Sequence, residues 1–124
     1  MKTAKMNVAG KDHTLCFSLR VVRDCADKFG GMDKLSEALT GGTQQEQFDN
    51  VIWLLSRMMD AGERYDKLEG RPAEKALSVD DLLDLQGVDD LASLKSTIFE
   101  TMDGGGEAVE TEPEEKNAET SQGG

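Results

Sequence analysis

The stretch that begins at Thr43 constrains the fold most, because it combines a helix start with one long apolar face. Thr43 and Glu46 have the Thr-x-x-Glu spacing of a capping box, in which each side chain binds a backbone N–H at the start of a helix. Apolar residues then recur at helical spacing, at Phe48, Val51, Ile52, Leu55, Met58 and Met59. We predict a central helix that runs to about Ala61-Gly62, with a further turn or two up to Leu68.

The residues before this helix predict a β-hairpin and a first helix. Residues 5–9 and 13–17 are short, partly alternating segments, and Gly10-Lys11-Asp12 between them suits a turn in which the glycine takes a positive φ. From Ser18 the apolar period becomes helical, so we predict a helix over 19–29 that ends at Gly30-Gly31. Its expected apolar face consists of Leu19, Val22, Ala26 and Phe29.

Three shorter helices complete the predicted body. The first carries Met32, Leu35 and Leu39 on one face and ends at Gly41-Gly42. The second begins after Ser78, which stands at capping distance from Asp81, and ends at Gly87. The last spans about 89–102, with Leu91, Leu94, Ile98 and Met102 on one side.

The acidic residues divide the chain into a body and a tail. The whole chain has 25 acidic and 14 basic residues, a formal charge of -11, and seven of the acids with one base lie beyond Met102. Such a segment buries too little apolar surface to offset its chain entropy. We therefore expect a mainly α protein: a domain over 1–102, with an N-terminal β-hairpin and a small bundle of five or six short helices, and a disordered acidic Gly/Glu-rich tail over 103–124.

Charge and hydropathy exclude several classes of partner. A negative body without a basic stripe has little to displace counterions from phosphates, which argues against nucleic-acid binding. No apolar run approaches the roughly 18 residues of a membrane span, and residues 1–6 lack the apolar core of a signal peptide. We expect a cytoplasmic protein without a membrane partner. In that compartment Cys16 and Cys25 are expected to be small buried thiols rather than a disulfide.

Residues that could carry covalent chemistry are few. His13 is the single histidine, and it stands three residues from Cys16 in a predicted strand, so the two side chains point to opposite faces. The aspartate-rich segment 80–90 fails the calcium-loop pattern, because Leu82 occupies loop position 3, which must supply a ligand, when counted from Asp80. We interpret these aspartates as helix caps. We predict no catalytic, metal-binding or cofactor-binding residue, and a protein that is not an enzyme.

The expected function therefore depends on the surface. At about 100° per residue, Trp53 lies on the side of the central helix opposite its apolar stripe. Either a second element covers it, or it is an exposed anchor for a partner. Met32, Met58, Met59 and Met102 either fill the core or form an adaptable apolar surface for helical partners. Our candidate partner-binding residues are Trp53, Met58, Met59 and Met102.

Several of these segments together resemble phage and prophage tail assembly chaperones of long-tailed phages and gene transfer agents. The likeness covers about residues 6–102 and consists of hydrophobic spacing and glycines. Its segments are Val8-Ala9-Gly10-Lys11, Leu15-Cys16-Phe17-Ser18-Leu19, Phe29-Gly30-Gly31, and Trp53-Leu54-Leu55 in a helix that ends at Ala61-Gly62.

This resemblance implies a non-enzymatic protein in the cytoplasm of a bacterial host cell. Such a protein binds the tape-measure protein, a long helical polypeptide, and keeps it soluble until tail-tube subunits polymerise around it. The tape-measure protein is the expected partner, and the tail-tube protein and a second copy of the chain are further candidates.

A second class of function is an acidic protein-binding module, such as a DNA mimic or an inhibitor of a nucleic-acid-binding protein. The charge of -11 favours it. Against it, many acids of the body alternate with Lys and Arg instead of forming a continuous phosphate-like row. Binding to a basic partner should weaken as salt rises, whereas an apolar helix-in-groove contact should persist.

Overall fold

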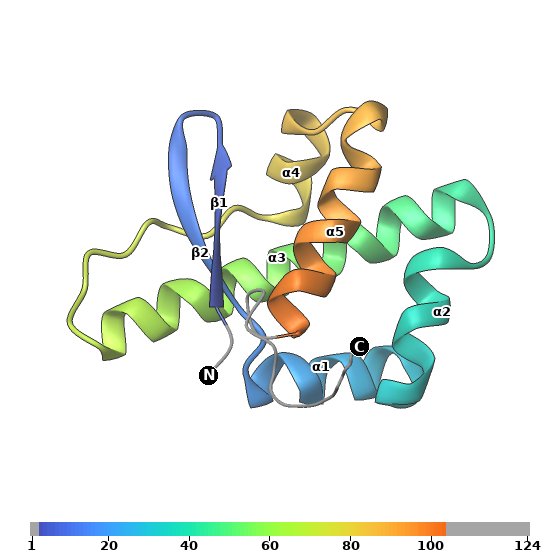
Figure 1. Cartoon of the computed structure of the whole chain (residues 1–124), viewed down its shortest axis with the longest axis horizontal. Helices are drawn as coiled ribbons and strands as arrows, with labels where there is room; N and C mark the ends of the chain where they lie inside the picture. Colours follow the sequence, from blue (N-terminus) through green and yellow to red (C-terminus); the bar gives the residue numbers. More distant parts are fainter. Residues whose placement is uncertain (1–2, 104–124) are drawn as a thin grey trace, which may run out of the picture.

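A computed structural model describes residues 3–103 and arranges a hairpin and four shorter α-helices around one long helix (Figure 1). The predicted mainly α fold with an N-terminal β-hairpin is confirmed. Apart from Asp103, the predicted disordered tail lies outside the described residues. The elements are β1 (Thr3–Val8), β2 (Lys11–Cys16), α1 (Leu19–Phe29), the 3-10 turn η1 (Met32–Lys34), α2 (Leu35–Thr40), α3 (Gln44–Leu68), α4 (Val79–Leu85), the 3-10 turn η2 (Val88–Asp90) and α5 (Leu91–Met102).

The two strands pair antiparallel through a tight turn at Ala9 and Gly10. Val8 pairs with Lys11, and the two turn residues have φ values of 52° and 86°. Positive φ at both central residues is typical of the type I′ turn, which follows the twist of the strands. The positive φ of Gly10 was predicted, but the turn lies earlier than expected, because Lys11 already belongs to β2.

The predicted capping box starts α3. The backbone N–H of Thr43 donates to Glu46 Oε1 at 2.8 Å, and the backbone N–H of Glu46 donates to Thr43 Oγ1 at 3.1 Å. The helix then continues without a break through Gly62 to Leu68, so it is longer than the predicted core of the segment. Gly62 is a contact site, because a Cβ at this position would lie 1.7 Å from the carbonyl oxygen of Thr14. The missing side chain lets β2 approach the helix axis.

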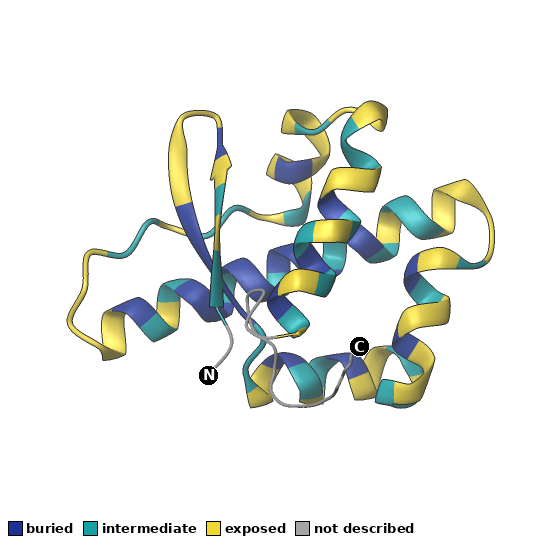
Figure 2. Cartoon of the chain, viewed as in Figure 1, coloured by how far each residue is buried: buried dark blue, intermediate teal, exposed yellow. Residues whose placement is uncertain are grey.

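The core surrounds α3, which contacts β2, α1, α2, α4 and α5 (Figure 2). Its fully enclosed side chains come from every one of these elements, and they include Leu15, Val21, Leu39, Leu54, Leu55, Met58, Leu82 and Ile98. The apolar face predicted for α1 was wrong in part. Val21 and Cys25 are its buried residues, whereas Leu19, in the first turn, is 86% exposed.

An extended segment, residues 69–78, returns along α3 and determines where α4 begins. The backbone N–H of Ala76 donates to Glu63 Oε1 at 2.9 Å. Ser56 Oγ donates to the carbonyl oxygen of Leu77 at 3.2 Å, so this segment is bound at two points of the helix. Ser78 then caps α4 by the predicted capping box with Asp81. No helix within residues 3–103 has the length and apolar character that crossing a bilayer requires.

Candidate partner-binding site

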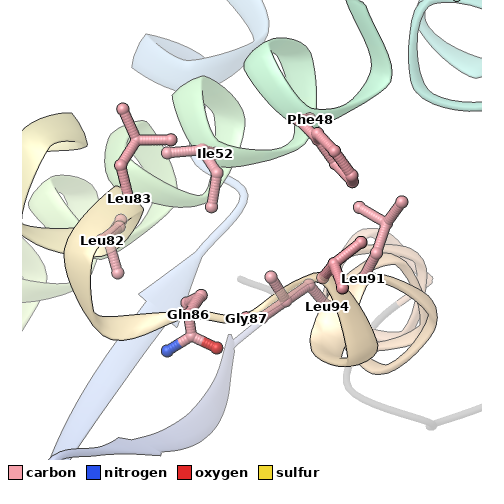
Figure 3. A pocket seen from close by; sticks show the side chains of 9 residues that line it. Phe48, Ile52, Leu82, Leu83, Gln86, Gly87, Leu91 and Leu94 are labelled. Atoms are coloured by element: carbon pink, nitrogen blue, oxygen red, sulfur yellow. The ribbon is translucent and has the colours of Figure 1, made fainter. Parts of the chain in front are cut away.

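An apolar cleft lies where α4 and the start of α5 pack beside the first half of α3 (Figure 3). Its volume is about 180 Å³. The side chains that line it are almost all aliphatic or aromatic, and none can titrate. They are Phe48, Ile52, Leu82, Leu83, Gln86, Val88, Leu91 and Leu94, with Gly87 in the connecting turn.

The short connection between α4 and α5 holds the cleft open on one side. The backbone N–H of Gln86 donates to the carbonyl oxygen of Leu82 at 3.0 Å, which closes the last turn of α4. The backbone N–H of Gly87 donates to Asp90 Oδ2 at 2.8 Å, and η2 follows at once. This tight corner leaves Leu83 47% exposed and Val88 67% exposed. Burying these two side chains and the adjoining apolar cleft against another apolar surface would remove them from water, which is favourable.

The size and lining of the cleft limit what it can bind. Small-molecule sites usually enclose about 300–1,000 Å³ and contain several polar groups that fix orientation. This cleft is smaller and offers only the amide of Gln86 and backbone groups. It suits one or two apolar side chains projected from another polypeptide, as in helix-in-groove recognition.

Met58 and Met59 do not belong to any exposed surface. They are 0% and 1% exposed, and Met59 Sδ accepts a hydrogen bond from the backbone N–H of Leu77 at 3.3 Å. Their prediction as partner-binding residues is corrected, because β2 and segment 69–78 pack against α3 and the two side chains fill the core. Met102, at the end of α5, is half-buried, and its role in partner binding stays a prediction.

Trp53 is partly covered by the end of α1. Its ring meets that of Phe29 edge-on, with centroids 5.6 Å apart and planes at 85°. Lys28 Nζ lies 5.0 Å from the centroid of the Trp53 ring, a distance that suits a cation–π contact. Trp53 is therefore half-buried, and the alternative in which a second element covers it describes the structure better. Its role as a partner anchor stays a prediction.

The residues considered for covalent chemistry are enclosed. Burial raises the pKa of the Cys16 and Cys25 thiols to about 11 each, and both cysteines are free. Thiols with such a pKa are protonated at neutral pH and react poorly as nucleophiles. His13 is 2% exposed, its Nδ1 has no hydrogen-bond partner, and burial lowers its pKa. Within residues 3–103, no three His, Cys, Asp or Glu side chains are placed to hold a metal ion.

The sequence pattern did not predict the cleft itself. Phe48 was predicted on the apolar stripe of the central helix, and Leu83 falls within the short helix predicted between Ser78 and Gly87, without a reason to expect either at a surface. A signal was present in Leu82-Leu83, because two adjacent helical positions point about 100° apart and a short helix seldom buries both. Val88, next to Asp89-Asp90, had no distinguishing pattern.

Comparison with protein-family models, curated proteins and solved structures finds no match to this chain.

Proposed function

We propose that this chain is a non-enzymatic tail assembly chaperone of the kind used by long-tailed phages and prophages. It binds an apolar stripe of the helical tape-measure protein in the cytoplasm of the bacterial host and keeps that protein soluble until the tail tube forms. The observation that supports this proposal best is the cleft between α3, α4 and α5, with Leu83 and Val88 exposed at its edge. The sequence resemblance over residues 6–102 supplies the identity of the client.

The cleft suits this task physically. An amphipathic helix presents large side chains at positions i, i+3, i+4 and i+7, and one or two of them fill a cavity of this size. Removing apolar surface from water is worth roughly 25 cal/mol per Å² and needs no particular sequence. The same cleft can therefore bind any one of many similar apolar stripes along the client. The formal charge of -11 keeps copies of the chaperone apart while they hold the client.

The alternative is an acidic module that covers a basic protein surface, such as a DNA mimic or an inhibitor of a nucleic-acid-binding protein. The run from Ala76 to Leu94 favours it, because this run contains five Asp and no basic residue. The two functions differ in their response to salt. A contact made by charge alone is lost near 1 M salt, where screening acts within about 3 Å, whereas apolar burial persists.

Co-expression with the tape-measure protein of the same gene cluster tests the proposal. We expect the wild-type chain to raise the soluble fraction of that client and to co-purify with it at high salt. The double variant Leu83→Ser/Val88→Ser should lose both effects. Leu68→Ser is the matched control, because Leu68 is 86% exposed but does not line the cleft, and it should behave as the wild type.

A client that stays insoluble in the presence of the folded wild-type chain would contradict the chaperone function. A complex that dissociates at 1 M salt and ignores the double variant would favour the acidic module instead.

A further inference from the structure

The chain segment that forms one side of the apolar cleft is rich in aspartate. Between Lys75 and Lys95 the chain has five Asp and no Lys or Arg, and this run contains α4, η2 and the start of α5. Asp80 stands three residues before Leu83 on α4, and Asp84 follows Leu83 directly. Asp89 follows the exposed Val88. Asp80 therefore shares one side of α4 with Leu83, whereas Asp84 points about 100° away from it. The side chain of Asp89 lies beside Gly87, which lines the cleft, because its Oδ1 is 2.7 Å from the position of a Cβ on that glycine.

Within residues 3–103, none of these five carboxylates forms an ion pair. The acids of α3 show the contrast: Asp60 pairs with Arg64 at 3.0 Å and Glu63 pairs with Lys67 at 2.7 Å. Two of the five aspartates serve as caps, since Asp81 and Asp90 accept hydrogen bonds from backbone N–H groups. Asp80, Asp84 and Asp89 have no such internal function and are exposed.

The nearest bases along the chain do not neutralise this edge. Lys95 Nζ donates to Gln47 Oε1 at 2.7 Å, on the first turns of α3. On the other side, Lys75 forms no ion pair with any of the five aspartates. Lys95 keeps its charge on the side of the cleft formed by α3 and α5, because Gln47 is neutral. The side formed by α4 and η2 carries aspartates that no ion pair within residues 3–103 neutralises, next to open apolar surface, and such negative charge attracts cations and repels anionic partners.

We infer that the cleft binds a basic amphipathic helix, in which the apolar side chains that enter between α3, α4 and α5 are flanked by Lys or Arg. This inference rests on the proposed function, because it names the chemistry of the client segment bound at the same site. Long basic side chains suit the geometry, since their aliphatic stems extend over the apolar edge while their charged ends reach the carboxylates.

Another exposed apolar groove of the molecule has a different character. Leu19 and Leu68, each 86% exposed, lie beside Arg20, Arg64 and Lys67. Two of these three bases are already paired with acids of α3. This groove therefore has a weaker net field than the cleft, and a second copy docking its acidic edge there is an outcome that the test must separate.

The test uses the full chain and two synthetic helices that have the same leucine stripe and equal helix content. One helix carries four Lys beside the stripe, and the other carries four Glu at the same positions. Fluorescence anisotropy of the labelled helices measures the affinity. At low salt we expect the Lys helix to bind at least about tenfold more tightly than the Glu helix, and we expect this ratio to fall below about threefold at 1 M salt.

Charge-neutral variants locate the effect. Asp80→Asn/Asp84→Asn/Asp89→Asn should reduce the preference for the Lys helix to less than about threefold. Both helices should still bind through their leucine stripe. The matched control removes three exposed acids of α1, η1 and α2, and should keep the preference; it is Asp27→Asn/Asp33→Asn/Glu37→Gln. Leu83→Ser/Val88→Ser should lose both helices.

Each other result overturns the inference. Equal affinity for both helices at low salt, or an equal effect of the two neutralised variants, would show that the edge does not select charge, while the proposed function would stand. Failure of both helices to bind would contradict the proposed function as well. A concentration-dependent oligomer that Leu83→Ser/Val88→Ser and Leu68→Ser each dissociate would assign the cleft to a second copy of the chain.

Discussion

The two halves of α3 differ in how completely the rest of the chain covers their apolar surface. Around Gly62 the chain itself closes the helix, because the backbone of β2 lies so near that no side chain fits between them. Around Phe48 and Ile52 the helix meets α4 and α5 across a cleft of about 180 Å³. The N-terminal hairpin covers the second half of α3. The first half borders an open cleft that side chains of another molecule could enter.

Stability and the proposed partner binding therefore depend on different halves of one helix. Contacts at the β2 end involve backbone atoms and enclosed side chains, so they tolerate little change. The edge of the cleft is formed by the exposed Leu83 and Val88, whose replacement removes few internal contacts.

Gly62→Ala should be the most damaging single substitution. The new methyl group would overlap the carbonyl oxygen of Thr14, which lies 1.7 Å from the Cβ position, so either β2 or α3 must move. The better helix propensity of alanine, worth about 1 kcal/mol, opposes only part of this cost. We expect the free energy of unfolding to drop by on the order of 4 kcal/mol, measured by urea denaturation.

Asp49→Ala is the matched control for this substitution, because it also places an alanine on α3 but at an exposed position. We expect it to change the free energy of unfolding by less than about 0.5 kcal/mol. Equal effects of the two alanines would show that β2 does not lie against Gly62.

The sequence was sufficient for the parts of the fold that local chemistry determines. The starts of α3 and α4 were predictable because Thr43 with Glu46 and Ser78 with Asp81 form capping boxes within four residues. The role of Gly62 was not predictable in this way. A glycine inside a helical pattern also fits a helix end, and only the approach of β2 from 48 residues earlier in the chain distinguishes the two.

The candidate site was harder to predict, because periodicity gives the angle between side chains but not which face the rest of the chain will cover. On α1 the covered face includes Val21 and Cys25, although Leu19 fitted the expected stripe. On α3 the methionines fitted both a core and a surface. The cleft forms because α4 and α5 pack against α3, and no local sequence pattern predicts this tertiary contact.

The enclosed Met58 and the half-buried Met102 should contribute differently to stability. Met58→Ala should lower the free energy of unfolding by about 3 kcal/mol, because it removes an enclosed side chain and leaves a cavity in the core. Met102→Ala, at the half-buried end of α5, should cost about 1 kcal/mol or less. Thermal and urea unfolding of both variants measure the difference, and a larger loss in Met102→Ala would reverse our assignment of the core.

The smallest effect that we predict is a pH dependence at the hairpin. Burial lowers the pKa of His13 below its usual 6.5, although Glu74 opposes this shift, so the folded chain prefers the neutral imidazole. The unfolded chain then binds more protons than the folded one, and stability is lost as the pH falls below about 6.5. Glu63, whose pKa is lowered by the hydrogen bond from the backbone N–H of Ala76, adds its own loss only near and below pH 4.5. Urea unfolding between pH 5 and 7.5 should therefore show a slope that His13→Gln flattens, and an equal slope in both proteins would mean that the imidazole is free to take up a proton in the folded chain.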